Sequence, residues 1–191
     1  NNIQQTQQQI QDTINKRKIV NENLINSKNN LTALEDSYFK KQSGFLNKLF
    51  TKKETIENIG VQIEETRTQV GFLENELNSL TVNIDELHSG IDESQYNNLL
   101  TLFEQVTKSN KIWNIVSVKQ NTETKSSASN HIDRKEVNLS ILNVESISSK
   151  FKALYFKNLN GAGLFIYPSF VLEFLNNEQV RLTDIKDLSI T

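Results

Sequence analysis

Few side chains in this sequence have the types and spacing that catalysis or metal binding requires. The densest group is Ser129, His131 and Asp133, which places a hydroxyl, an imidazole and a carboxylate close together in the chain. A hydrolytic triad also needs a rigid nucleophile turn and an oxyanion hole, and no motif for either accompanies these residues. His131 and Asp133 lack the further ligands of a zinc site, and the chain has no cysteine. We therefore expect no enzyme activity, no catalytic residue, no metal and no cofactor.

The remaining polar candidates have plainer interpretations. His88 stands at the edge of an apolar series and is expected on the rim of a helix. The run Gly161–Gly163 has no following Gly-Lys-Ser/Thr and no following helix, so it predicts a hairpin turn instead of a phosphate-binding loop. Asp184 and Asp187 could pair as carboxylates, but capping of a short helical turn is the plainer interpretation.

Aromatic side chains recur in the last part of the chain and could stack nucleic-acid bases. They are Trp113, Tyr155, Phe156, Phe165, Tyr167, Phe170 and Phe174. Alternating aromatic residues in a small sheet more often form its core, and the net charge of −2 does not favour a polyanion. We therefore expect no nucleic-acid partner.

The stretch 40–53 combines positive charge with bulky apolar side chains, and no acidic residue interrupts it. Such a surface suits a protein partner, or an anionic membrane into which apolar groups insert while lysines meet headgroups. A third interpretation is that the apolar side chains close the end of a helical hairpin and leave solvated lysines. The candidate contact residues are Lys40, Lys41, Phe45, Leu46, Lys48, Leu49, Phe50, Lys52 and Lys53.

An apolar series between residues 56 and 91 predicts the main helix that positions these candidate residues. Its steps alternate between three and four residues, the spacing of a helix that buries one seam against another helix. The seam residues are Ile56, Ile59, Ile63, Val70, Leu73, Leu77, Leu80, Ile84, Leu87 and Ile91, and Thr66 fills the only gap. We expect a helix from about 52 to 89, begun by a capping box from Thr51 to Glu54.

Residues 1–42 predict the partner helix, although its glutamine-rich start is expected to fray. They carry six basic and four acidic residues, against three and ten in 51–94, so opposite charges favour an antiparallel pair. The predicted unit is a coiled-coil helical hairpin over 1–92, with its tip at about 43–51. The rival is a parallel homodimer through 56–91, in which the acidic residues would repel, and two hairpins could also form a four-helix bundle.

A second unit is expected over 93–191. Residues 94–110 predict a helix whose wide apolar stripe packs on a globular domain. β-Branched and aromatic runs predict strands at 112–118, 137–143, 153–158, 164–167, 170–175 and 180–183, with a polar loop at 121–130. The expected fold class is α+β: a long antiparallel coiled-coil hairpin, then a short helix and a small antiparallel sheet that is truncated at the C-terminus.

The end of the sequence resembles the middle of bacterial PH-like or GRAM-like barrels. The resemblance covers residues ~150–190: a strand, the Asn160-Gly161 turn, a strand, Pro168-Ser169, a strand, a turn, and then Val180–Leu188 with its Asp-Ile step. It implies a non-catalytic barrel that binds lipid headgroups or peptides, and a long C-terminal helix beyond Thr191.

These features predict a non-catalytic protein–protein interaction or scaffolding module within a larger bacterial protein, in which a helical arm presents a small β domain. We expect a protein partner or self-association. The alternative is a lipid- or peptide-binding PH-like module whose basic, apolar tip contacts a membrane surface. The sequence has no run of about 18 apolar residues and no signal peptide, and we expect a cytoplasmic location.

Overall fold

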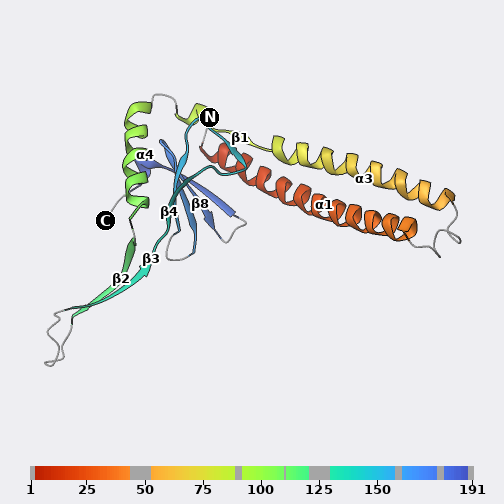
Figure 1. The fold of residues 1–191 in the computed structure, drawn as a ribbon. Helices are drawn as coiled ribbons and strands as arrows, with labels where there is room; N and C mark the ends of the chain where they lie inside the picture. The colour runs from red at the N-terminus through yellow and green to blue at the C-terminus, as the bar shows by residue number, and fades with distance from the viewer. Residues whose placement is uncertain are drawn as a thin grey trace. The chain divides into compact units, whose positions relative to one another are not determined.

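The computed structural model describes residues 3–43, 53–88, 92–109, 111–120, 130–157, 161–175 and 179–188. It combines helices with an antiparallel sheet, which confirms the predicted α+β class (Figure 1). The chain divides into two compact units, one formed by Asp12–Val82 and the other by Asn1–Gln11 together with Asn83–Thr191. The sequence had placed this boundary near residue 92.

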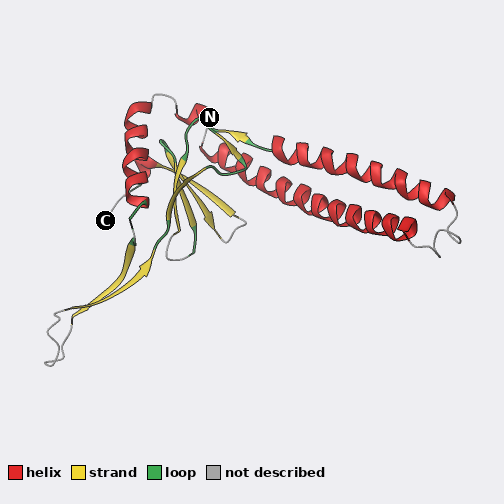
Figure 2. Cartoon of the chain, in the orientation of Figure 1, coloured by secondary structure: helices red, strands yellow, loops and turns green. Residues whose placement is uncertain are grey.

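The unit Asp12–Val82 is a pair of antiparallel helices. They belong to α1 (Ile3–Ser43) and α3 (Lys53–Ser79), which run side by side within one chain as predicted (Figure 2). Apolar residues from both helices form their shared core, because each helix buries the stripe that it cannot leave in water. The core consists of Val20, Leu24 and Leu73, with Val70, Leu77 and Leu80 packed against it.

Two ion pairs connect the outer surfaces of the helices. Lys28 Nζ lies 2.7 Å from Glu74 Oε1, and Arg67 Nη2 lies 2.7 Å from Glu35 Oε1. The hydrogen bond to Glu35 raises the pKa of Arg67. Only the first pair joins a base on α1 to an acid on α3, the arrangement that the charge counts predicted. Both pairs are exposed, so they orient the helices more than they stabilise them.

The first part of the predicted seam lies on α3, but the helix ends before the last seam residues. α3 ends at Ser79, so the expected end near Ser89 is wrong. Ile84 and Leu87 belong to the other unit, where Ile84 is 1% exposed. The gap at Thr66 is explained by its hydroxyl, which donates to the carbonyl of Gln62 at 2.7 Å and so needs no other partner.

Arg17 interrupts the apolar face of α1 and closes the end of α3. Its Nη1 donates to the carbonyls of Leu77 and Leu80 at 2.6 and 3.1 Å. The last carbonyls of a helix have no partner within that helix, so a cation placed there satisfies them and meets the negative end of the dipole.

Replacing Arg17 by methionine is therefore expected to lower the free energy of unfolding of the helix pair by about 1.5–3 kcal/mol, the contribution of charged hydrogen bonds. Lys16→Met is the matched control, because Lys16 is the exposed neighbour on the same helix. Urea unfolding followed by circular dichroism measures both variants. Equal effects from the two substitutions would show that Arg17 does not cap α3.

The second unit contains a five-stranded antiparallel sheet in the order β4-β6-β7-β8-β9. Its strands are β4 (Leu139–Leu142), β6 (Ala153–Lys157), β7 (Gly163–Ile166), β8 (Phe170–Leu175) and β9 (Gln179–Asp184). The other elements are β1 (Val82–Asn83), the 3-10 helix η1 (Asp85–His88), α4 (Glu93–Thr107), β2 (Trp113–Gln120), β3 (Asn130–Glu136), β5 (Ile147–Ser148) and the 3-10 helix η2 (Ile185–Asp187). Five of the six predicted strands form this sheet, whereas the one predicted at 112–118 is β2, which pairs with β3 in a separate two-stranded sheet.

A hairpin of β2 and β3 precedes the sheet, and β3 was not predicted. It pairs with β2 from Trp113↔Glu136 to Gln120↔Asn130, with a register shift between Ile115 and Ser117. The charged sequence of β3 hides the strand, because neither of its faces is apolar enough to show a period of two.

Glutamines from the start of α1 close the β9 edge of the sheet. Gln11 Oε1 accepts from the Val180 N–H, and Gln7 Oε1 accepts from the Leu182 N–H, both at 2.9 Å. The spacings match, since four helical residues rise about 6 Å and two strand residues span about 7 Å. Ile10 is fully buried beside them, so the expected fraying of this segment is wrong.

Candidate functional site

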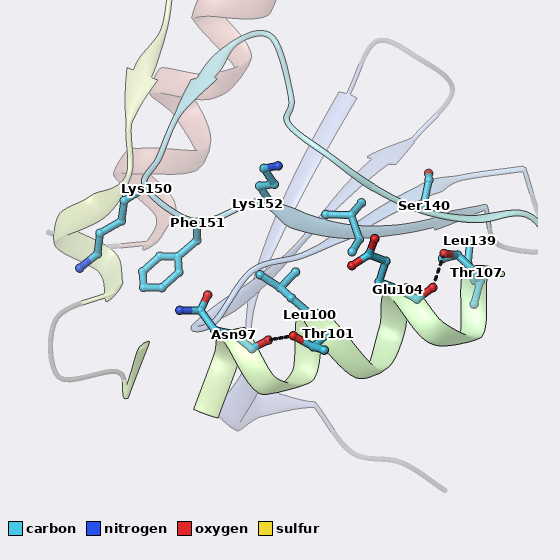
Figure 3. A pocket seen from close by; sticks show the side chains of 11 residues that line it. Asn97, Leu100, Thr101, Glu104, Thr107, Leu139, Ser140, Lys150, Phe151 and Lys152 are labelled. Atoms are coloured by element: carbon cyan, nitrogen blue, oxygen red, sulfur yellow. Dashed lines mark hydrogen bonds between the residues drawn. The ribbon is translucent and has the colours of Figure 1, made fainter. Parts of the chain in front are cut away.

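A groove of about 700 Å³ lies between α4 and β4. Figure 3 shows its two walls: side chains of α4 on one side, and side chains of β4 and of the segment Lys150–Lys152 on the other. Its lining residues are Asn97, Leu100, Thr101, Glu104, Thr107, Leu139, Ser140, Ile141, Lys150, Phe151 and Lys152. The lining mixes apolar and polar groups, the composition of a binding site that fixes both position and orientation.

Local sequence places α4 beside the strand. Asp92 caps the helix, since its Oδ1 accepts from the N–H groups of Ser94 and Gln95 at 2.9 and 3.3 Å. The first inward residue, Tyr96, is buried, and its ring meets Phe151 edge to face with centroids 5.4 Å apart. The helix therefore begins at a fixed point against the wall of the groove.

The Tyr96 hydroxyl replaces a missing backbone donor. It donates to the carbonyl of Lys152 at 2.7 Å and also lies 3.0 Å from the carbonyl of Ile166. Continuing the pairing Leu154↔Ile166 by two residues sets Lys152 opposite Pro168, which has no N–H to give. Burial raises the pKa of Tyr96, so the hydroxyl keeps its proton and remains a donor.

The segment Ser149–Phe151 is held from its other side by η1. Asp85 Oδ1 accepts from the Lys150 N–H at 2.9 Å and from the Ser149 hydroxyl at 3.1 Å. Lys150 Nζ pairs with the Glu93 carboxylate, which joins the segment to the first turn of α4. Both walls of the groove are thus fixed to each other by hydrogen bonds as well as by packing.

The backbone at the open edge of β4 has unused hydrogen-bonding capacity. The Tyr167 N–H donates to the Phe170 carbonyl at 2.9 Å, which fixes the alternation of the ladder, and the β7–β6 and β6–β4 pairings continue without a register shift. Counted along these pairings, the backbone N–H and C=O groups of Ser140 point toward β6, whereas those of Leu139 and Ile141 point away from the sheet. In the described part of the chain, no strand pairs with that side of β4.

The hydrogen bonds at the opposite edge of the sheet agree with this alternation. Counted in the same way through β8 and β9, the backbone groups of Val180 and Leu182 point outward, and the glutamines of α1 accept from these two N–H groups. One edge of the sheet is therefore closed by the chain's own side chains, while the other borders the groove.

A buried histidine lies away from the groove, in the core of the same unit. His88 is 3% exposed and stacks on Phe170 with ring centroids 5.3 Å apart, and its Nδ1 lies 2.8 Å from Ser169 Oγ. Its Nε2 is buried and has no hydrogen-bond partner among the described residues. Burial lowers the pKa of His88 to about 4, with Asp85 opposing and Lys150 adding to the shift. The predicted rim position is wrong, because His88 lies outside α3 and is a neutral core residue.

Exposed apolar side chains mark further surface on α4 and on the β2–β3 hairpin. In the hairpin, directly opposed residues share a face, so the register places four apolar residues on one face of the ribbon. They are Trp113, Ile115, Val118 and Ile132, all exposed. On α4 the exposed residues are Leu99, Leu102 and Val106. Apolar groups gathered in this way are typical of interaction surfaces.

Among the described residues, those that the sequence analysis considered for catalysis or metal binding have structural roles or positions in strands. Ser129 lies outside the described residues, and the backbone of His131 belongs to β3, not to a loop. Asp133 Oδ2 accepts from the Ser117 hydroxyl at 2.7 Å, and Asp184 caps η2 by accepting from the Lys186 N–H at 2.9 Å. No group of three potential metal ligands occurs among the described residues.

The predicted contact tip falls almost wholly outside the described residues. Lys40 and Lys41 occupy the last turn of α1, and Lys53 begins α3. Phe45, Leu46, Lys48, Leu49, Phe50 and Lys52 lie in the range that the structure does not describe. The groove residues were not among the predicted site residues, since no sequence pattern connects α4 with a strand more than 30 residues later.

The aromatic residues of the sheet pack on one another. Tyr155 and Phe165 have ring centroids 4.7 Å apart, and Phe165 and Phe174 have centroids 5.3 Å apart. Tyr167 and Phe170 are buried. These rings contribute to packing, as the sequence predicted, and do not form a row of free stacking platforms.

Comparison of the chain with protein-family models, with curated proteins and with solved structures finds no match. The resemblance of residues ~150–190 to PH-like barrels therefore stays a prediction. In the helices that the structure describes, none has the length and apolar character needed to cross a membrane.

Proposed function

We propose that this chain is a non-catalytic protein-interaction module whose partner docks in the groove between α4 and β4. The observation that carries the proposal is the difference between the two edges of the sheet. β9 is closed by Gln7 and Gln11, whereas the outward groups of β4 adjoin a cavity of about 700 Å³. A sheet edge left open beside a groove is a common recognition surface.

Two further features support an interaction role. The exposed apolar residues of α4 and of the β2–β3 hairpin offer additional contact area outside the groove. The helix pair provides a long surface on which Lys40 and Lys41 precede the basic, apolar stretch of the sequence.

The test uses binders selected against the whole chain from a display library of randomised linear peptides. Thr101→Arg places a long charged side chain in the groove, while Asn98→Arg adds the same charge on exposed α4 surface that does not line it. We expect Thr101→Arg to weaken binding at least tenfold, which is about 1.4 kcal/mol, and Asn98→Arg to leave it unchanged. Binders that tolerate Thr101→Arg, or a library that yields none, would overturn the groove as the docking site.

A second candidate function is contact between the stretch 40–53 and an anionic membrane, favoured by its run of lysines and bulky apolar residues. Sedimentation with anionic vesicles tests it. Binding that disappears in a Phe45→Ser, Phe50→Ser double variant would support membrane contact, and the absence of vesicle binding by the unchanged chain would contradict it.

A further inference from the structure

We infer that the ligand of this groove is an extended peptide that adds to β4 as a new edge strand. The inference rests on the proposed function and specifies the partner's chemistry. Its basis is the juxtaposition of the outward N–H and C=O groups of Leu139 and Ile141 with the groove wall of α4. Unpaired strand groups of this kind are satisfied best by the backbone of another strand.

Just before β4, the same edge already forms a backbone hydrogen bond to another segment of the chain. β3 reaches β4 through only Val137 and Asn138, and the Val137 N–H donates to the Ile112 carbonyl at 2.9 Å. The backbone N–H and C=O groups of Val137 face the same side as those of Leu139 and Ile141, because the three residues alternate along the strand. Ile112, which directly precedes β2, therefore pairs on the side that β4 leaves open. α4 ends at Thr107, before Ile112, and an added peptide would continue this ladder along Leu139 and Ile141.

The groove also indicates which side chains the peptide carries. A strand presents alternate side chains to one face, so every second residue would point between β4 and α4. Leu100, Ile141 and Phe151 provide apolar surface there. Lys152 lines the groove and is exposed, without an ion pair in the described part of the chain. The fitting ligand is an extended segment with apolar residues at alternate positions.

A pair of substitutions at Leu139 isolates the backbone hydrogen bond. Leu139→Pro removes an N–H that faces away from the sheet, at the first position of an edge strand, where proline is tolerated. Leu139→Ala removes more of the side chain than Leu139→Pro does but keeps the N–H, so weaker binding by the proline variant cannot come from lost side-chain contact. For the selected peptides, we expect Leu139→Pro to bind about tenfold more weakly than Leu139→Ala, with both variants retaining the unfolding transition of the unchanged chain. Equal affinities of the two variants would overturn strand addition.

Methylation of the peptide's own amides gives a second readout that does not depend on the fold of the chain. N-Methylation at successive positions is expected to weaken binding at every second residue, because only alternate amides of a strand face β4. Peptides that lose binding to Thr101→Arg but tolerate every methylation would overturn strand addition and leave the groove proposal standing. Peptides that are insensitive to Thr101→Arg would overturn the groove proposal itself.

Discussion

Replacing Gln7 and Gln11 together by alanine is expected to lower the free energy of unfolding by about 2–6 kcal/mol, since each leaves one buried amide without its acceptor. Val180 and Leu182 are both buried, and within the described residues no strand pairs with that side of β9. Urea unfolding followed by circular dichroism measures the loss. The exposed strand edge is also expected to increase self-association, detectable by light scattering.

Gln5→Ala together with Gln9→Ala is the matched control. These glutamines belong to the same helix and the same polar run, but both are exposed. The control makes the same change in helix propensity, so any difference between the pairs reports the bonds to β9. If the two double variants unfolded at the same urea concentration, the closing of this edge would contribute nothing to stability.

Acidification is expected to remove on the order of 3 kcal/mol of stability through His88 alone, the equivalent of its pKa difference. Burial lowers the pKa of His88 from 6.5 to about 4 in the folded chain. Between these values the unfolded chain binds a proton that the folded chain does not. The stability that depends on neutral His88 is therefore fully present above pH ~6.5 and is lost as the pH drops towards about 4.

His88→Phe tests this account because it keeps a flat ring between Phe151 and Phe170 while removing the titrating group. The variant loses the contact with Ser169 and is expected to be less stable at neutral pH. Its unfolding free energy should nevertheless decline less between about pH 6.5 and pH 4 than that of the unchanged chain. Parallel pH profiles for the two proteins would show that His88 titrates normally and is not buried as described.

Much of the fold follows from local patterns in the sequence. The strands β6 to β9 carry alternating or β-branched apolar residues between turn signals, so their positions could be read directly. The antiparallel helix pair follows from the apolar series, whose residues Ile59, Ile63 and Leu73 are buried. These elements are predictable because side-chain burial repeats with the period of the element itself.

The sequence-based predictions of helix bounds and fraying are wrong where a side chain packs on, or hydrogen-bonds to, an element far away in the chain. The series continues through Leu80 and Ile84 at helical spacing, but Ile84 is buried in the β-containing unit. Asn83 then begins η1, since its Oδ1 accepts from the Asp85 N–H at 2.8 Å. Likewise, a polar glutamine run indicates fraying only if its amides have no acceptor or donor nearby, and here β9 supplies the donors.

The groove could not be predicted for a related reason. Its walls come from α4, β4 and Lys150–Lys152, and their association depends on Tyr96 bonding to a carbonyl that faces Pro168. No single stretch contains that information. The open edge of β4 likewise becomes evident only when strand order and register are known.

Amide hydrogen exchange of the whole chain, measured residue by residue by NMR without any ligand, is the sharpest test of the open edge of β4. We expect Leu139 and Ile141 to exchange much faster than Ser140 and Leu142, because only the latter pair donates to β6. We also expect Val180 and Leu182 to exchange slowly, because Gln11 and Gln7 accept from them. Equal protection of Leu139, Ser140, Ile141 and Leu142 would show that this edge is already covered and would contradict the proposed site.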